Sequence, residues 1–286
     1  MGDNVLIKYN DIGDSIIYKT EERKSYFARL DPDKSNLREQ AIAANFDYVF
    51  VIVSLNKDFN LRRIERYLAL SWQSGAIPVV IFTKADLVDD YDKQVREVEG
   101  IAPGVDILVV SAHTGQGLDK INKLLEPQKS AVFLGSSGVG KSSLLNALTG
   151  KETMTTAAIR EDDSKGRHTT THRQLIALKS GASVIDTPGM RELGMWEADS
   201  GLGEAFADVE AYFERCKFSD CTHQNEPGCA VLEAIKNSEL PKARFDNYLK
   251  LKTENNYFDN KTDYIRKKND KFKSINQELR KIKKKK

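Results

Sequence analysis

The sequence has no apolar run near the roughly 20 residues that a membrane-spanning helix requires. Its first residues mix acidic and polar side chains with short apolar stretches, which is not the pattern of a secretory signal peptide. Cysteine is also scarce, since the chain has only three and all lie between residues 216 and 229. An odd, clustered set argues against a disulfide framework and favours a metal site. We expect a cytoplasmic protein with no membrane association.

Excess charge of either sign is small overall, at +2, but it is unevenly distributed. Residues 261–286 contain twelve basic and three acidic side chains, whereas residues 1–260 contain 32 basic and 39 acidic ones. An acidic body with a basic tail favours a polyanionic partner such as nucleic acid. A solvated, frayed tail is the alternative interpretation.

Unbroken apolar runs predict buried parallel strands, because a strand covered on both faces shows no alternation of apolar and polar residues. Stretches with helical periodicity, such as residues 61–72, separate these runs and predict an α/β domain with a parallel sheet. The runs cover residues 48–53, 78–82, 107–110, 131–134 and 184–185.

The two ends of the chain have different patterns. Short β-like runs around Gly13 and Asp14 predict hairpins before residue 37, in a segment too short for a closed barrel. After about residue 200 the pattern is helical and polar, including a predicted helix over residues 204–215. We therefore predict three domains: a β segment at 1–36, the α/β domain at 37–198, and a helical domain with the basic tail at 199–286.

Residues 135–142 read GSSGVGKS and fit the phosphate-binding pattern G-x-x-x-x-G-K-[ST]. The motif follows an apolar run and precedes a helical one, which is the strand–loop–helix context that the pattern needs. We expect Lys141 to reach the β- and γ-phosphates and Ser142 to coordinate Mg²⁺. The predicted phosphate-loop residues are Gly135, Ser136, Ser137, Gly138, Val139, Gly140, Lys141, Ser142 and Ser143.

Residues 186–189 read DTPG and fit the D-x-x-G element that follows a strand. We expect Asp186 to reach Mg²⁺ through water and the N–H of Gly189 to sense the γ-phosphate. An ordinary turn would also fit this short motif, but its position after the phosphate loop favours the nucleotide interpretation.

Two further motifs predict guanine recognition. Residues 83–86 read TKAD and resemble N-K-x-D, in which the aspartate accepts hydrogen bonds from guanine N1 and N2, a donor pair that adenine lacks. Asp86 therefore favours GTP over ATP, while Thr83 replaces the usual asparagine beside Lys84. Ser111 and Ala112 fit the short S-A element that contacts guanine O6.

The order of these motifs is rotated relative to ordinary GTPases. The two base-reading motifs precede the phosphate loop here, whereas they usually follow D-x-x-G. The same sheet can be closed from strands in rotated order, since domain termini often lie close together. The order therefore predicts a circularly permuted P-loop GTPase domain in which D-T-P-G leads directly into the C-terminal domain.

The catalytic residue is less directly indicated. Many GTPases place a water-orienting Gln after D-x-x-G, but this chain has Met190 there. Switch I is expected within Gly166-Arg-His-Thr-Thr-Thr171, with Thr170 as ligand of Mg²⁺ and γ-phosphate and Thr169 as the alternative. His168 is a candidate water-positioning residue, and a surface histidine in a loop is the alternative.

The pattern Cys216-x4-Cys221-x-His223-x5-Cys229 supplies three thiolates and one imidazole. This is a complete tetrahedral ligand set without an open position, so it predicts a structural zinc site. We expect metal removal to unfold the small domain around it.

Together the rotated order, G-R-H-T-T-T, D-T-P-G-M-R-E-L and C-x4-C-T-H-x-x-E-P-G-C resemble the circularly permuted, small-ribosomal-subunit-dependent GTPases (the RsgA or YjeQ family) over about residues 37–250. The resemblance implies an N-terminal OB barrel, a permuted GTPase domain and a C-terminal zinc domain. It also implies late maturation of the small ribosomal subunit, rRNA as partner, and slow GTP hydrolysis stimulated by the subunit.

Carried onto this sequence, the resemblance places the family's catalytic histidine on His168 and its switch I threonine on Thr170. Its zinc ligands fall on the Cys3His set. The chain departs from the family in Thr83 and in the short segment before residue 37, which predicts an incomplete OB-like barrel. We expect a monomer.

Two other functions fit parts of the sequence. An RNA-binding assembly module could use nucleotide as a slow conformational ligand, which Met190 favours weakly. A permuted ATPase or a transport GTPase is a further alternative, and Asp86 argues against ATP.

Overall fold

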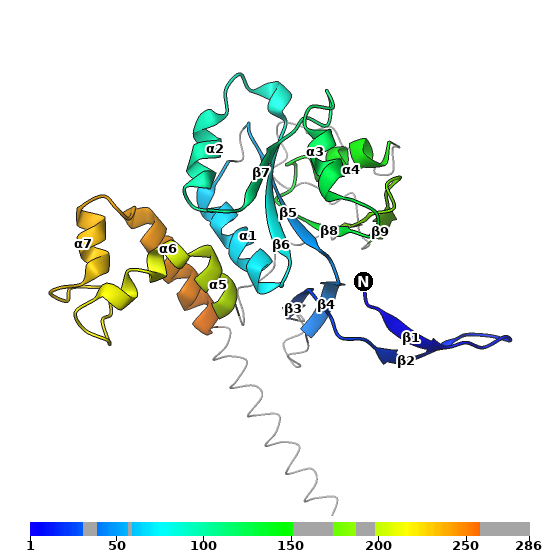
Figure 1. The fold of residues 1–286 in the computed structure, drawn as a ribbon, viewed down its shortest axis with the longest axis horizontal. Helices are drawn as coiled ribbons and strands as arrows, with labels where there is room; N and C mark the ends of the chain where they lie inside the picture. The colour runs from blue at the N-terminus through cyan, green and yellow to red at the C-terminus, as the bar shows by residue number, and fades with distance from the viewer. Residues whose placement is uncertain (31–38, 57–58, 151–173, 187–197, 258–286) are drawn as a thin grey trace, which may run out of the picture.

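The computed structural model describes residues 1–30, 39–56, 59–150, 174–186 and 198–257. At its centre lies a six-stranded sheet with the order β7-β6-β5-β8-β10-β9 (Figure 1). All neighbouring strands are parallel except β9, which is antiparallel to β10. The strands are β5 (Tyr48–Ser54), β6 (Ile77–Thr83), β7 (Asp106–Val109), β8 (Ser130–Leu134), β9 (Gln174–Ala177) and β10 (Ser183–Asp186).

The purely parallel sheet predicted from the sequence is therefore wrong at one edge. Among the four residues of β9 only Ile176 is buried, while its neighbours Gln174, Leu175 and Ala177 are exposed. Residues 175–178 read Leu-Ile-Ala-Leu, but so short an apolar run does not show that a strand lies at the edge of a sheet or in which direction it runs.

Helices cover both faces of the sheet (Figure 1). Helices α1 (Leu61–Gln73) and α2 (Asp92–Glu99) lie on one face, and α3 (Leu118–Leu124) and α4 (Lys141–Thr149) on the other. The buried side chains of β5 alternate between the two resulting cores. This double coverage explains why β5 reads as a continuous apolar run.

The N-terminal residues form two separate two-stranded sheets rather than a closed barrel in the described part of the chain. Strands β1 (Val5–Lys8) and β2 (Ile16–Thr20) form a hairpin that projects from the body (Figure 1), and every residue of both strands is exposed. Strand β3 (Tyr26–Leu30) pairs with β4 (Glu39–Ala44), a strand that the sequence analysis did not predict.

The C-terminal module, defined here as residues 198–257, is helical and packs on α1. It contains α5 (Asp199–Ala205), α6 (Ala207–Glu210), the 3₁₀ turn η3 (Phe213–Arg215), α7 (Ala230–Lys236) and a helical segment at 242–257. Helix α5 lies so close to α1 that a Cβ at Gly201 would be 2.1 Å from the carbonyl oxygen of Ala69. Every helix in the described part of the chain is too short or too polar to be a candidate membrane span.

The single helix predicted over residues 204–215 is divided into three short pieces. Phe206 interrupts it with non-helical backbone angles, because its fully buried ring packs edge-on against Tyr248 at 5.5 Å. Tertiary packing therefore overrides the local helical pattern at this point.

A buried arginine joins the module to α1. Arg244 is 2% exposed, donates to both carboxylate oxygens of Asp208 at 2.5 and 2.7 Å, and donates to Glu65 of α1 at 3.0 Å. Glu65 is 1% exposed and also accepts a hydrogen bond from Arg62 at 2.5 Å. The buried charges are thus paired across the contact, as burial requires.

Candidate functional site

The phosphate-loop motif lies between β8 and α4. Strand β8 is buried along its whole length, and α4 begins at Lys141 directly after Gly140. Gly135 has φ +155°, and a Cβ there would lie 2.4 Å from the carbonyl oxygen of Ile52. Only glycine fits this close approach between the loop and β5.

Two lysine side chains lie against the loop carbonyls. The Nζ of Lys141 donates to the carbonyls of Gly135 and Ser136 at 2.7 and 2.5 Å. The Nζ of Lys84 donates to the carbonyl of Gly138 at 2.8 Å. Both ammonium groups therefore bring positive charge to the loop that the sequence assigns to phosphate.

Thr83, at the end of β6, is hydrogen-bonded to the phosphate loop. The side chain is 3% exposed, and its hydroxyl donates to the carbonyl of Val139, with the carbonyl of Val53 as a longer acceptor at 3.3 Å. The threonine that replaces the expected asparagine thus links the β6 motif to the loop by a buried hydrogen bond.

The two base-reading motifs meet at the ends of β6 and β7. The hydroxyl of the buried Ser111 donates to Oδ1 of Asp86 at 2.5 Å and accepts from the N–H groups of His113 and Thr114. These contacts orient the Asp86 carboxylate, which lies in an exposed residue. Ala112 follows Ser111 directly.

The motifs gather at one edge because their strands are parallel. The C-terminal ends of β6, β7, β8 and β10 lead into Thr83, Ser111, Gly135 and Asp186, respectively. Ligands of open α/β sheets bind at this edge. Asp186 itself is 8% exposed and lies on the strand next to β8.

The remaining predicted nucleotide residues divide into two groups. Ser137, Ser142 and Ser143 lie in the loop and in the first turn of α4. His168, Thr169, Thr170, Gly189 and Met190 lie outside the residues that the structure describes.

The four residues predicted to bind zinc converge. The ligand atoms of Cys216, Cys221, His223 and Cys229 all lie within 4.8 Å of one another. Sγ of Cys216 is 4.0 Å from Sγ of Cys229, and these two sulfurs lie 3.6 and 3.5 Å from Nδ1 of His223.

These separations fit a tetrahedral zinc ion. Zn–S bonds of about 2.3 Å and a Zn–N bond of about 2.0 Å place tetrahedral ligands about 3.8 Å apart for S···S and about 3.5 Å apart for S···N. The donor set, three sulfurs and one imidazole, is that of a closed structural site.

Neighbouring residues hold the metal loop in shape. Glu226 accepts from the backbone N–H groups of Thr222, Gln224 and Asn225, and the Thr222 hydroxyl also donates to it. The Thr222 hydroxyl and the backbone N–H groups of Glu226 itself, Thr222 and Gln224 lower the pKa of Glu226 to about 2. Burial lowers the pKa of His223, which favours the neutral imidazole that metal binding requires.

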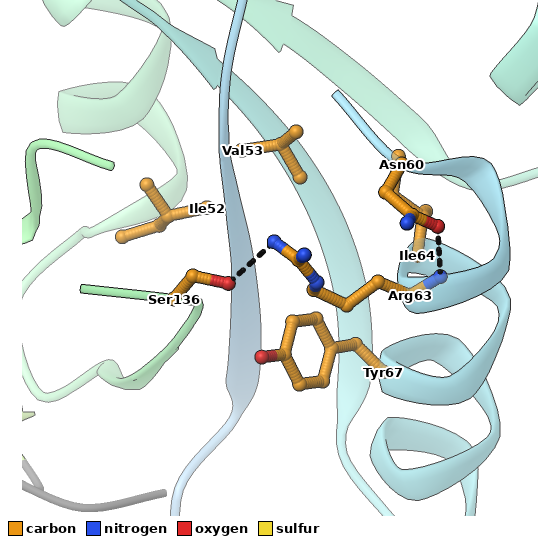
Figure 2. Close-up of a pocket in the computed structure, with 7 residues that line it drawn as sticks. All are labelled: Ile52, Val53, Asn60, Arg63, Ile64, Tyr67 and Ser136. Carbon is orange, nitrogen blue, oxygen red and sulfur yellow. Dashed lines mark hydrogen bonds between the residues drawn. The ribbon is translucent and has the colours of Figure 1, made fainter. Parts of the chain in front are cut away.

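One contact to the phosphate loop was not predicted from the sequence. Arg63 of α1 donates to Oγ of Ser136 at 2.7 Å across a small cleft between α1, β5 and the loop (Figure 2). The only sequence signal was an arginine in an amphipathic helix, which does not say where the guanidinium points.

Comparison with known proteins identifies similar chains. The sequence model described as RsgA GTPase matches residues 20–196. The chain is 47% identical over 269 residues to the small ribosomal subunit biogenesis GTPase RsgA 2 of Listeria monocytogenes, which covers 93% of this chain and 77% of that protein. It is 49% identical to the small ribosomal subunit biogenesis GTPase RsgA of Streptomyces avermitilis, over 84% of this chain and 65% of the relative.

Two solved structures are also similar. YjeQ from Thermotoga maritima matches with a TM-score of 0.61 and 31% identity, over 87% of this chain and 82% of that one. YloQ, described as a circularly permuted GTPase, matches with a TM-score of 0.59 and 26% identity, over 88% and 79% of the two chains.

Proposed function

The chain belongs to the RsgA GTPase family and is a GTP-hydrolysing enzyme; from this premise we propose that it acts in late maturation of the small ribosomal subunit, which stimulates its hydrolysis. The relatives carry small-subunit biogenesis in their names. The observation that carries the proposal is the meeting of the phosphate loop with Thr83, Asp86 and Ser111 at one sheet edge.

In this proposal guanine is read by Asp86, which Ser111 orients, while Lys84 lies along the loop. Lys141 leaves the loop carbonyls to meet the β- and γ-phosphates, a movement that a flexible lysine stem allows. Magnesium would be held by Ser142, Thr170 and Asp186, and it would neutralise phosphate charge there. His168 positions the attacking water, and the Gly189 N–H senses the γ-phosphate.

The metal centre has a structural role in this proposal. Zinc bound by the Cys3His set would cross-link the loop between η3 and α7, in addition to the hydrogen bonds that Glu226 accepts within it. The rRNA contacts come from the module and from the basic residues 261–286, which lie outside the described part of the chain. The protein acts as a cytoplasmic monomer with no membrane contact.

The testing experiment measures steady-state GTP hydrolysis with and without purified small ribosomal subunits, at low and high salt. We expect stimulation by at least about tenfold that weakens as salt rises, because phosphate contacts release counterions. Large subunits are the matched control. Two outcomes would contradict the proposed partner. One is equal stimulation of GTP hydrolysis by small and large subunits, and the other is no stimulation by either.

The variant His168→Ala separates this proposal from an RNA-binding module that uses nucleotide as a conformational ligand. We expect it to bind GTP with unchanged affinity but to lose stimulated turnover. Subunit maturation that persists in cells carrying this variant would favour the RNA-binding module.

A further inference from the structure

Helix α1 begins beside the phosphate loop. The side chain of Asn60 caps its first turn by accepting from the N–H of Arg63 at 3.1 Å, and the Arg63 guanidinium reaches Ser136 (Figure 2). The cleft around this contact is lined by Ile52, Val53, Asn60, Arg63, Ile64, Tyr67 and Ser136, and holds about 10 Å³. That volume admits about one water molecule, and the hydrogen bond from Arg63 links the position of Ser136 to α1.

The same helix also makes contacts with the C-terminal module. Arg66 donates two hydrogen bonds to the two carboxylate oxygens of Glu254, both at 2.7 Å. One residue earlier, Glu65 accepts from the buried Arg244. At the far end Gln73 accepts from the backbone N–H of Gly201 at 3.1 Å. The contacts with the module therefore extend along the whole helix.

A helix held at both ends transmits displacement as a rigid body. The close approach of Gly201 to Ala69 leaves no room for α5 to slide without moving α1. Packed interfaces change between discrete arrangements rather than deforming gradually. A shift of the module therefore reaches the first turn of α1, and with it Arg63.

Ser136, which accepts from Arg63, also contacts the lysine of the phosphate loop. The Ser136 carbonyl accepts from Lys141, the lysine expected to move to the phosphates. Arg63 fixes the side chain of this same residue. The orientation of Ser136 thus influences how readily Lys141 leaves the loop.

We propose that α1 couples the C-terminal module to the phosphate loop, with Arg63 as the positioning residue at the loop and Arg66–Glu254 as a contact at the module. This coupling rests on the proposed nucleotide site. It is separate from the covalent connection through D-T-P-G to the C-terminal module. Helix α1 precedes the phosphate loop in the sequence, whereas D-T-P-G follows it.

The test is a double-mutant cycle read by GDP affinity, measured by calorimetry on the full chain. Glu254→Gln weakens the module contact, and we expect GDP affinity to fall about threefold, the range of a partly exposed ion pair. Arg63→Met should lower it about tenfold, the lower end for one hydrogen bond to a charged group. The double variant should match Arg63→Met alone, because the module acts through Arg63.

A matched control lies on the same helical segment as Glu254. Asp246→Asn makes the same change of charge in an exposed i,i+4 pair with Lys242, and among the described residues Asp246 makes no hydrogen bond or ion pair with α1. It should leave GDP affinity unchanged. Arg63→Lys, which keeps a charged donor, should recover most of the affinity lost in Arg63→Met, and urea unfolding should show that all variants are folded.

Independent, additive losses in the double variant would overturn the coupling, and so would wild-type GDP affinity in folded Glu254→Gln. Should Glu254→Gln fail to fold, Arg66→Gln breaks the same contact from α1 and must give the same loss. A wild-type chain that binds no GDP would instead contradict the proposed nucleotide site.

Discussion

Arg244→Met is expected to destabilise the contact between the C-terminal module and α1. Arg244 is 2% exposed, stacks on Phe206 at 4.6 Å, and donates to Asp208, Glu65 and the carbonyls of Ile101 and Ala205. Methionine keeps an unbranched apolar side chain in place of the arginine methylenes. It removes the positive charge that compensates the buried Glu65 carboxylate. Removing one partner of a buried ion pair costs about 3–5 kcal/mol.

The lower end of that range applies here. Arg62 and Asn247 continue to hydrogen-bond Glu65, and Asp208 keeps a side chain that is 40% exposed. We therefore expect a loss of about 3 kcal/mol in the free energy of unfolding. In urea this lowers the unfolding midpoint by about 1 M if the slope is about 3 kcal/mol per molar. Circular dichroism and tryptophan fluorescence follow the transition.

A second substitution tests whether the unpaired Glu65 carboxylate causes the loss of stability. Glu65→Gln added to Arg244→Met removes the orphaned charge, so we expect it to recover about 1 kcal/mol or more of the loss. Arg62→Met, at the half-exposed end of the network, should cost less than about 1 kcal/mol. The reasoning is refuted by a loss under about 1 kcal/mol for Arg244→Met, or by a double variant that is less stable than the single one.

Three further changes have defined outcomes. Thr83→Val removes the hydroxyl from Val139 and leaves a buried carbonyl unpaired, so GDP affinity should fall about tenfold in calorimetry; unchanged affinity would contradict the tether. Asp86→Asn should shift binding from GTP towards xanthine nucleotides in competition assays, and an unshifted preference would argue against guanine reading. Burial, with the Glu210 contact, raises the pKa of Tyr248; stability should therefore be full below pH 10 and fall as pH rises above it, by at most about 1.4 kcal/mol per pH unit, and Tyr248→Phe should abolish this slope in alkaline urea titrations.

The central strands could be predicted from the sequence because physics leaves few alternatives. A strand such as β5, buried on both faces, must be apolar throughout. Strand β9 was not predicted although residues 175–178 are apolar, since so short a run does not distinguish a strand from a buried helical segment. Nor was the break at Phe206, which depends on the distant ring of Tyr248.

The site divides in the same way. Motifs predicted the residues that meet around the phosphate loop and the four side chains that converge near His223, because the chemistry fixes residue type and spacing. Arg63 could not be predicted, because its role depends on where α1 crosses the end of β5. The roles given to His168 and Thr170 stay predictions.

The strand order also sets how the domain responds to mechanical force. Strands β5 and β10 flank β8 on its two sides and run parallel to it. The chain enters the sheet at the N-terminal end of β5 and continues towards the C-terminal module from the C-terminal end of β10, at the opposite edge. Tension between the N-terminal strands and the C-terminal module therefore loads all the hydrogen bonds of β8 at the same time, in shear. It does not break them one after another. When the N-terminal strands and the C-terminal module are both anchored on one large particle, the rate at which the GTPase domain unfolds under force decides how long it stays folded.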